Sequence, residues 1–330
     1  MGKAGRNQPT GSAVPLGLVL GVGLSGCVAV TTPSTAPPDE APGTWTILAP
    51  MPSARQEVAV AEAGGRVYVI GGLGEGYEPT ATVEAYDPAT NRWEPRTPLP
   101  IRVHHPAAVG VHGKVYLIGG YTGRFSWTPQ AAVFEYDPTT NAWRQRLSMP
   151  RARGALAAAA LNGKIHTLGG AAAGVTLTAH EVYDPLTDRW SHAAAMPTAR
   201  DHLAAATLGG KLYALGGRES FFGRKHAVVE IYDPATDSWR SGAPLPLARG
   251  GLAAAALDGR LFVVGGELPF RIISATEMYD PAAGRWTAKA AMPTPRHGIG
   301  AAAVGNRIYV PGGGTRPGPG RSSALEAFEP

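Results

Sequence analysis

The chain has 330 residues, a formal net charge of +5, one cysteine, 44 glycines and 30 prolines. The weak, scattered positive charge argues against a nucleic-acid partner, and a single cysteine excludes a disulfide within the chain. A chain of this length would ordinarily suggest two domains, but its sequence repeats leave no gap for a domain boundary.

Residues 1–27 have the pattern of a bacterial lipoprotein signal peptide. Lys3 and Arg6 give a positive start, residues 13–23 form an apolar stretch, and small residues precede Cys27. In such a signal the leader is removed and Cys27 becomes the lipid-bearing N-terminus. The alternatives are an uncleaved membrane anchor and a buried apolar strand. We expect an exported protein that is anchored through Cys27 to a bacterial envelope membrane, on its periplasmic or extracellular side.

Residues 28–43 are rich in threonine, proline and serine and contain almost no large apolar residues. Such a composition cannot bury enough apolar surface to fold. We therefore expect a disordered tether between the lipid anchor and a folded domain at residues 44–330.

The folded domain is predicted to consist of six similar units with a period of 47 to 50 residues. Each unit has an apolar run that ends in Gly-Gly, then Tyr-Asp-Pro or a close variant, and one tryptophan that precedes a Gly-Gly by 26 residues. All variation in length lies between Gly-Gly and the following strand. Four short strand-like segments per unit, without a helical pattern, predict an all-β six-bladed β-propeller. The glycine pairs begin at Gly71, Gly119, Gly169, Gly216, Gly265 and Gly312.

The unit resembles the Kelch repeat in its arginine, Gly-Gly, Glu-x-Tyr-Asp-Pro and tryptophan positions, over residues 44–330. This resemblance implies a propeller whose blades share one face for their variable loops. It leaves the function open, because Kelch propellers include protein-binding modules, carbohydrate binders and a few enzymes.

The two ends of the domain each supply part of one unit. Residues 44–48 match only the outermost, tryptophan-bearing strand, and the C-terminus at Pro330 stops where that strand would follow. We predict that the N-terminal strand completes the last blade, so that the ring closes without an exposed edge.

An arginine stands ten residues after most of the tryptophans, and a glutamate stands two residues before Tyr or Phe in the third strand. These arginines either form a ring of cations that binds an anion, or pair with the glutamates inside each blade. Unit two favours pairing, because Val103 and Phe134 replace both charges together. The expected pairs are Arg55–Glu84, Arg153–Glu181, Arg200–Glu230, Arg249–Glu277 and Arg296–Glu326.

Aromatic residues outside the repeat positions all fall in the variable loops, together with several arginines. Aromatic and arginine side chains on loops over a rigid scaffold are typical of a binding face. Some of these aromatics are instead expected to cover the channel or a neighbouring blade. The predicted ligand-binding residues are Tyr77, Tyr121, Arg124, Phe125, Trp127, Arg218, Phe221, Phe222, Phe270 and Arg271.

Catalytic motifs are scarce. No phosphate loop, nucleophile elbow or His-Glu-x-x-His motif is present, and the histidines lack metal-ligand spacing, although His104, His105, His202 and His297 are candidates for the channel mouth. We predict no cofactor and no metal. Copper-radical chemistry of the kind found in some Kelch oxidases needs a tyrosine cross-linked to a cysteine, and the expected lipid anchor takes the one cysteine, Cys27.

The favoured function is an envelope-anchored, non-catalytic module that binds a protein or a glycan through the loops after Gly-Gly. The alternative is an exported sugar mutarotase, because the chain is also similar to the six-bladed Kelch enzymes that interconvert sialic acid (N-acetylneuraminate) anomers. That family works with a carboxylate and an arginine. Arg218 and Glu219 are the local candidates for such a pair.

Overall fold

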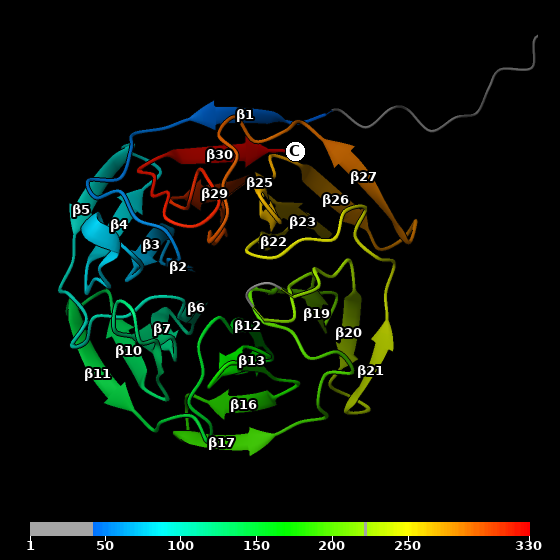
Figure 1. The fold of residues 1–330 in the computed structure, drawn as a ribbon, viewed down its shortest axis with the longest axis horizontal. Coiled ribbons are helices and arrows are strands. Elements are labelled where there is room, and N and C mark those ends of the chain that lie inside the picture. Colours follow the sequence, from blue (N-terminus) through cyan, green and yellow to red (C-terminus); the bar gives the residue numbers. More distant parts are fainter. Residues whose placement is uncertain (1–41, 221–222) are drawn as a thin grey trace, which may run out of the picture. The chain divides into compact units, whose positions relative to one another are not determined.

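The structure, a computed structural model, describes residues 42–220 and 223–330. These residues form six four-stranded antiparallel sheets, arranged as blades around one central axis (Figure 1). The predicted all-β six-bladed propeller is confirmed. Within the described ranges the single helical segment is the short 3-10 turn η1 (Glu75–Tyr77), and none is long and apolar enough to cross a membrane.

Each blade runs from an innermost to an outermost strand. Blade 1 contains β2 (Ala59–Ala63), β3 (Arg66–Ile70), β4 (Val83–Asp87) and β5 (Arg92–Pro95). Blade 2 contains β6 (Ala107–Val111), β7 (Lys114–Ile118), β10 (Val133–Asp137) and β11 (Ala142–Arg146). Blade 3 contains β12 (Ala157–Leu161), β13 (Lys164–Leu168), β16 (His180–Asp184) and β17 (Arg189–His192).

Blade 4 contains β18 (Ala204–Leu208), β19 (Lys211–Leu215), β20 (Val229–Asp233) and β21 (Ser238–Ser241). Blade 5 contains β22 (Ala253–Leu257), β23 (Arg260–Val264), β26 (Thr276–Asp280) and β27 (Arg285–Lys289). Blade 6 contains β28 (Ala302–Val304), β29 (Arg307–Pro311), β30 (Leu325–Glu329) and the N-terminal β1 (Thr44–Ile47). Three two-stranded ribbons lie in the variable loops: β8 (Tyr121–Thr122) with β9 (Thr128–Pro129), β14 (Ala171–Ala172) with β15 (Val175–Thr176), and β24 (Glu267–Leu268) with β25 (Arg271–Ile272).

The N-terminal strand closes the ring as predicted. β1 pairs antiparallel with β30, in a register that places Trp45 opposite Phe328, and the two strands lie side by side in Figure 1. The carbonyl of Pro42 already accepts a hydrogen bond from the backbone of Ala290 at 2.7 Å. Residues 1–41, which hold the expected signal peptide, Cys27 and most of the expected tether, lie outside the described residues.

Neighbouring blades are joined at their rims by the repeated tryptophans. Each indole N–H donates to a backbone carbonyl of the preceding blade, as from Trp93 to Ala49 at 2.8 Å and from Trp239 to Ala194 at 2.7 Å. Since β1 belongs to blade 6, the bond from Trp45 to Ala290 at 2.8 Å joins blades 5 and 6. These side chains are half-buried rather than fully buried.

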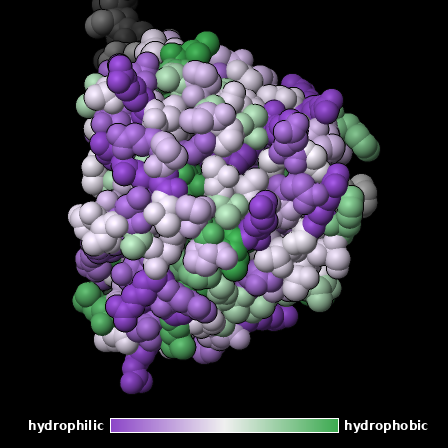
Figure 2. Space-filling view, turned by 90° about the vertical axis from the view of Figure 1, so that its left-hand side faces the viewer, coloured by the Kyte–Doolittle hydropathy of each residue, from purple (hydrophilic) through white to green (hydrophobic). Residues whose placement is uncertain are grey.

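The hydrophobic core is divided among the gaps between blades, with apolar side chains from two adjacent sheets in each cluster. The alanine-rich innermost strands line a central cavity of about 270 Å³, which explains why their side chains are small. The outer rim beside β5 and β11 is mostly hydrophilic and carries only small separate apolar groups (Figure 2). That side therefore presents no broad apolar surface to a partner.

Candidate functional site

The repeated arginines pair with the repeated glutamates inside their own blades, as predicted. Arg55 contacts Glu84 at 2.6 Å and Arg200 contacts Glu230 at 2.6 Å, and the arginines are almost completely buried. Arg200 also donates to the carbonyl of Gly216 at 2.8 Å, so it does cross the glycine pair on its way to the glutamate. Burial lowers the pKa of Arg200, and Glu230 opposes that shift. The other pairs are Arg153–Glu181, Arg249–Glu277 and Arg296–Glu326.

Blade 2 replaces this ion pair with apolar contact. Val103 is fully buried and Phe134 is 5% exposed, and both belong to the same hydrophobic cluster. The substitution of both partners at once leaves no unpaired charge in the blade. The arginine ring is therefore part of the scaffold, and both terminal nitrogens of each of its guanidinium groups have hydrogen-bond partners within the protein.

The second residue after each arginine position lies in a ring of backbone hydrogen bonds around the axis. In each blade its N–H donates to the carbonyl of the equivalent residue in the preceding blade, at 2.8 to 3.0 Å. All six residues have positive φ, which suits glycine and strains other residues. The ring consists of Glu57, His105, Ala155, His202, Gly251 and Gly298. Blades 1, 2 and 4 therefore place a titratable residue in a positive-φ backbone conformation that only glycine adopts without strain.

The first residue after each arginine position pairs with the residue that follows Gly-Gly. Asp201 pairs in this way with Arg218, and His104 with Tyr121. This bridge brings the start of the innermost strand and the root of the variable loop together. The channel mouth on the loop face is thus built from equivalent positions of all six blades.

Several charged groups are buried together at this mouth. Arg218 donates to Glu267 at 2.6 Å and to Asp201 at 3.2 Å, and its Nη2 lies 2.8 Å from Nε2 of His202. The other ring nitrogen of His202 lies 2.6 Å from Asp201. Burial alone would raise the pKa of Asp201, but the His202 hydrogen bond and the Arg218 charge outweigh it and lower that pKa.

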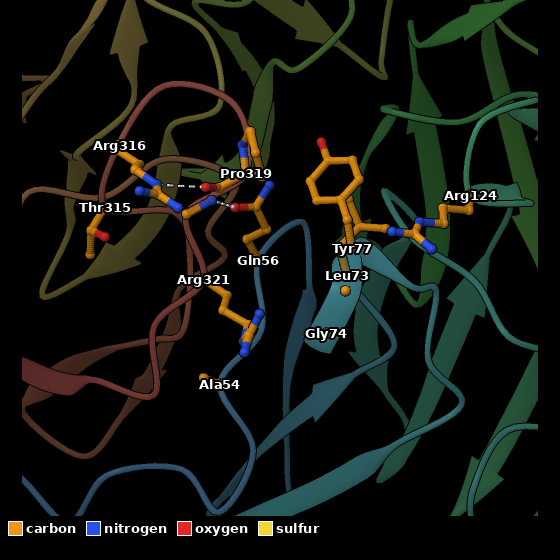
Figure 3. Close-up of a pocket in the computed structure, with 12 residues that line it drawn as sticks. Ala54, Gln56, Leu73, Gly74, Tyr77, Arg124, Thr315, Arg316, Pro319 and Arg321 are labelled. Atoms are coloured by element: carbon orange, nitrogen blue, oxygen red, sulfur yellow. Dashed lines mark hydrogen bonds between the residues drawn. The ribbon is translucent and has the colours of Figure 1, made fainter.

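A pocket of about 610 Å³ opens beside the mouth, between loops of blades 1, 2 and 6. Its lining includes Tyr77, Arg124, Arg316 and Arg321, and Figure 3 shows the arginines on opposite sides of the Tyr77 ring. Arg124 also pairs with Glu78 at 2.9 Å. The volume is that of a typical small-molecule site, and the three guanidinium groups make the pocket suited to an anion.

Tyr77 and Gln56 connect this pocket with the charged mouth. Gln56 accepts from the backbone of Gly320 at 2.7 Å, which fixes the blade 6 loop against blade 1 (Figure 3). Burial, together with the charge of nearby Glu57, raises the pKa of Tyr77 to about 12. Tyr77 is therefore a neutral hydrogen-bonding group between the two regions.

The blade 2 loop divides its predicted site residues between the mouth and the solvent. Trp127 packs against His104 and His105, with ring centroids 4.8 Å apart in both cases. Tyr121 is buried and donates to the carbonyl of Ala171 at 2.8 Å. Phe125 is instead 85% exposed, under the guanidinium of Arg124.

The remaining predicted residues do not gather at one point. Glu219 pairs with His226 at 3.0 Å, and Arg218 forms ion pairs with Asp201 and Glu267. Phe270 is 93% exposed and Arg271 is also exposed, both near the ribbon of β24 and β25. Phe221 and Phe222 lie outside the described residues.

Sequence reasoning missed Glu57, Asp201 and Glu267. A signal was present, because the two residues after each arginine position change in chemical type from unit to unit within an otherwise constant framework. They read Gln-Glu, His-His, Gly-Ala, Asp-His, Gly-Gly and His-Gly in chain order. The loops after Gly-Gly vary in length from unit to unit, and this variation suggested them as the binding site. The two residues after each arginine position vary in chemical type while the spacing stays constant, and these residues form the channel mouth.

The model of the Kelch motif matches residues 54–100, 102–150, 199–246 and 248–293, more than half of the chain. Among solved structures, one described as "Structure of YjhT" superposes with a TM-score of 0.74 at 17% sequence identity, and the match covers 84% of this chain and 95% of that one. At this identity the likeness shows the fold alone. The comparison with curated proteins found no match. The repeats, the closed ring and the motif match together show that the chain belongs to the Kelch family.

Proposed function

We propose that the protein is an envelope-anchored, non-catalytic binding module that takes an anionic ligand in the pocket on its loop face. The observation that carries this proposal is the cluster of Arg124, Arg316 and Arg321 around one concave pocket. Arg316 uses Nε to hold the carbonyl of Pro319 at 2.7 Å, which orients the side chain and leaves its terminal amino groups for a ligand. A preorganised guanidinium favours carboxylate and sulfate groups.

A glycan that carries an acidic group fits this site better than a flat protein surface. The pocket is concave, and Tyr77 supplies an aromatic ring of the kind on which a sugar ring packs. A protein partner remains the other form of ligand, bound through an acidic segment that enters the same pocket.

Isothermal titration calorimetry tests the ligand class. N-acetylneuraminic acid and glucuronic acid are the probes, and N-acetylglucosamine is the neutral control. We expect the acidic sugars to bind and Arg316→Ala to weaken that binding by at least about tenfold, the effect of one charge-assisted contact. Equal binding of neutral and acidic sugars would contradict the anionic ligand, and no sugar binding would favour a protein partner.

A second function is favoured by the buried acid–base groups beside the pocket. Glu57 and Glu267 both lie near Nδ1 of His297, at 3.6 and 3.4 Å, and Tyr77 links this region to the arginines. A carboxylate with an arginine is the requirement for a sugar mutarotase or epimerase of the N-acetylneuraminate type. NMR exchange between sugar anomers separates the two functions, because the binding module leaves the exchange rate unchanged and the enzyme accelerates it.

The membrane anchor is a separate part of the proposal and rests on the sequence around Cys27. The wild-type protein is expected to partition with membranes, whereas Cys27→Ser should appear as a soluble protein or an uncleaved precursor. Several acyl chains on one cysteine would make the attachment stable, unlike a single chain. Equal membrane retention of both forms would contradict lipidation.

A further inference from the structure

We propose that the channel mouth binds a divalent metal cation of the Zn²⁺ type, with Glu57 and His105 as the primary ligands and His202 as the third. Ligand atoms of these three side chains all lie within 4.8 Å of one another. This proposal goes beyond the binding function of the neighbouring pocket and does not depend on it.

Hydrogen bonding determines which nitrogen of His105 carries its proton. Nε2 of His104 lies 3.2 Å from the carbonyl of Gly123, an acceptor, so His104 must carry its proton on Nε2. Its Nδ1 is then an acceptor, and it lies 2.5 Å from Nδ1 of His105. His105 must therefore donate from Nδ1, and neutral His105 has its lone pair on Nε2.

That lone pair faces a carboxylate. Nε2 of His105 lies 3.2 Å from Oε2 of Glu57, and the two side chains are 3% and 9% exposed. Two acceptors in buried contact repel each other unless a proton or a metal cation lies between them, and a metal cation would satisfy both lone pairs at once. Two zinc ligands at ordinary bond lengths are separated by about 3.4 Å in tetrahedral geometry, so the pair is already spaced as one edge of a coordination shell.

The same conflict recurs at His297. Its Nε2 lies 3.2 Å from the carbonyl of Arg316, an acceptor, so in the neutral form of His297 the proton belongs on Nε2 and the lone pair lies on Nδ1. Nδ1 lies 3.6 Å from Glu57 and 3.4 Å from Glu267, both carboxylates. A cation near Glu57 therefore relieves two unfavourable contacts, and His297 becomes a further group beside the metal.

The backbone also prepares the position of Glu57. Its carboxylate lies over Gly298 in the hydrogen-bonded ring, where an added Cβ would approach the carboxyl carbon to 2.5 Å. Glu57 and His105 both have positive φ angles, and the ring of backbone hydrogen bonds around the axis holds them in this conformation. His104 accepts a hydrogen bond from Nδ1–H of His105 and so orients that ring, as metal-bound histidines commonly require.

His202 can bind the metal only if its Nε2 gives up a hydrogen bond, and neighbouring groups offset that loss. The lone pair on Nε2 of His202 accepts a hydrogen bond from Arg218, and a bound metal would use the same lone pair. Arg218 keeps Glu267 and Asp201 as partners after that loss. Asp201 also accepts from the other nitrogen of His202 and so acts as its outer-shell carboxylate. A donor set of two imidazoles and one carboxylate, with an open position, suits Zn²⁺.

The test is a titration of the untagged full-length protein with Zn²⁺ by calorimetry, repeated for Glu57→Gln and His105→Gln. We expect one site per chain in the wild type and at least about a 100-fold loss of affinity in each variant, since even outer-shell changes cost 10- to 100-fold. The matched control is His166→Gln, because His166 is buried in a histidine pair away from the mouth, 2.8 Å from His180. Cys27 is common to all variants, so any binding that it supports survives the substitutions.

Melting temperatures without metal show whether the variants fold. Absence of wild-type binding at micromolar Zn²⁺ would overturn the proposal whatever the variants do. Binding that survives both mouth substitutions, or that is lost equally in the His166 control, would also overturn it.

Discussion

The arginine–glutamate ring and the channel mouth are both buried and charged, yet they differ in how they repeat. The ring places the same pair at equivalent positions of five blades, and blade 2 removes both partners together through Val103 and Phe134. The mouth places different groups at equivalent positions, such as Glu57 in blade 1 and His105 in blade 2. A pair that recurs in most blades and is replaced as a pair in the remaining one indicates a structural role. Side chains that differ between blades while the backbone geometry stays the same indicate a ligand-binding role.

The largest expected effect comes from removing the strand that closes the scaffold. Deletion of residues 44–52 removes β1 and exposes β30 as an edge strand, so the protein should unfold or aggregate. Deletion of residues 28–41 should leave the melting temperature unchanged, because it stops before the Pro42 contact with Ala290. Thermal unfolding of the two proteins is the measurement, and similar behaviour of both would contradict ring closure by β1.

A break in one ring pair should have the next largest effect. Arg200→Ala leaves Glu230 buried and unpaired, so the free energy of unfolding should fall by about 3 to 5 kcal/mol. The double change Arg200→Val with Glu230→Phe copies blade 2 and should recover part of that loss. Urea unfolding measures both variants. A double variant no more stable than Arg200→Ala would mean that the pair does more than neutralise charge.

A change at the mouth should weaken binding without unfolding the protein. Trp127→Ala removes the indole that covers His104 and His105 and that donates to the carbonyl of Arg124, a pocket residue, at 3.3 Å. It should weaken ligand binding by about 1 to 3 kcal/mol with little change in melting temperature. Phe270→Ala is the matched control, since Phe270 is 93% exposed on the blade 5 loop, does not line the pocket and should matter little. Calorimetry with an acidic sugar distinguishes them, and equal effects would remove the distinction between buried and exposed loop aromatics.

The buried histidine pair of blade 3 should give the smallest effect. Burial lowers the pKa of His166 and His180 to about 4, whereas the unfolded residues bind protons below about 6.5. The unfolded state therefore gains protons first as the pH falls, and the stability that this pair contributes is lost between about pH 6.5 and pH 4.

The change His166→Tyr with His180→Val copies Tyr213 and Val229 at the equivalent positions of blade 4. We expect it to reduce the loss of stability between pH 7 and pH 5 by roughly 1 to 3 kcal/mol. Urea unfolding at the two pH values is the measurement. An unchanged pH dependence would show that other groups, such as His104 at the mouth, dominate it.

The fold could be predicted because its determinants recur at fixed spacing. Each Gly-Gly pair and each tryptophan performs the same task in every blade, so six copies reinforce one another. The arginine–glutamate pairs followed from one exception, Val103 with Phe134. The closing strand followed from the partial unit at each end of the domain.

The mouth could be predicted only in part. Glu57 and His297 lie far apart in sequence and meet because six blades close around an axis. No short-range sequence motif therefore predicts their contact. The conformation of the variable loops could not be predicted from the sequence either. Phe125 and Trp127 differ by two positions, yet one is exposed and the other packs on the mouth histidines.

Two arginines of blade 6 give the most direct test of the division between scaffold and site. Arg296 is fully buried and paired with Glu326, whereas Arg316 is exposed and lines the pocket. The measurement is urea unfolding of Arg296→Ala and Arg316→Ala, each with and without saturating acidic sugar. We predict that Arg296→Ala lowers the midpoint without ligand, and that Arg316→Ala keeps the wild-type midpoint but loses the stabilisation by ligand. A stable Arg296→Ala protein that no longer responds to ligand would instead show that the arginine ring is the binding site.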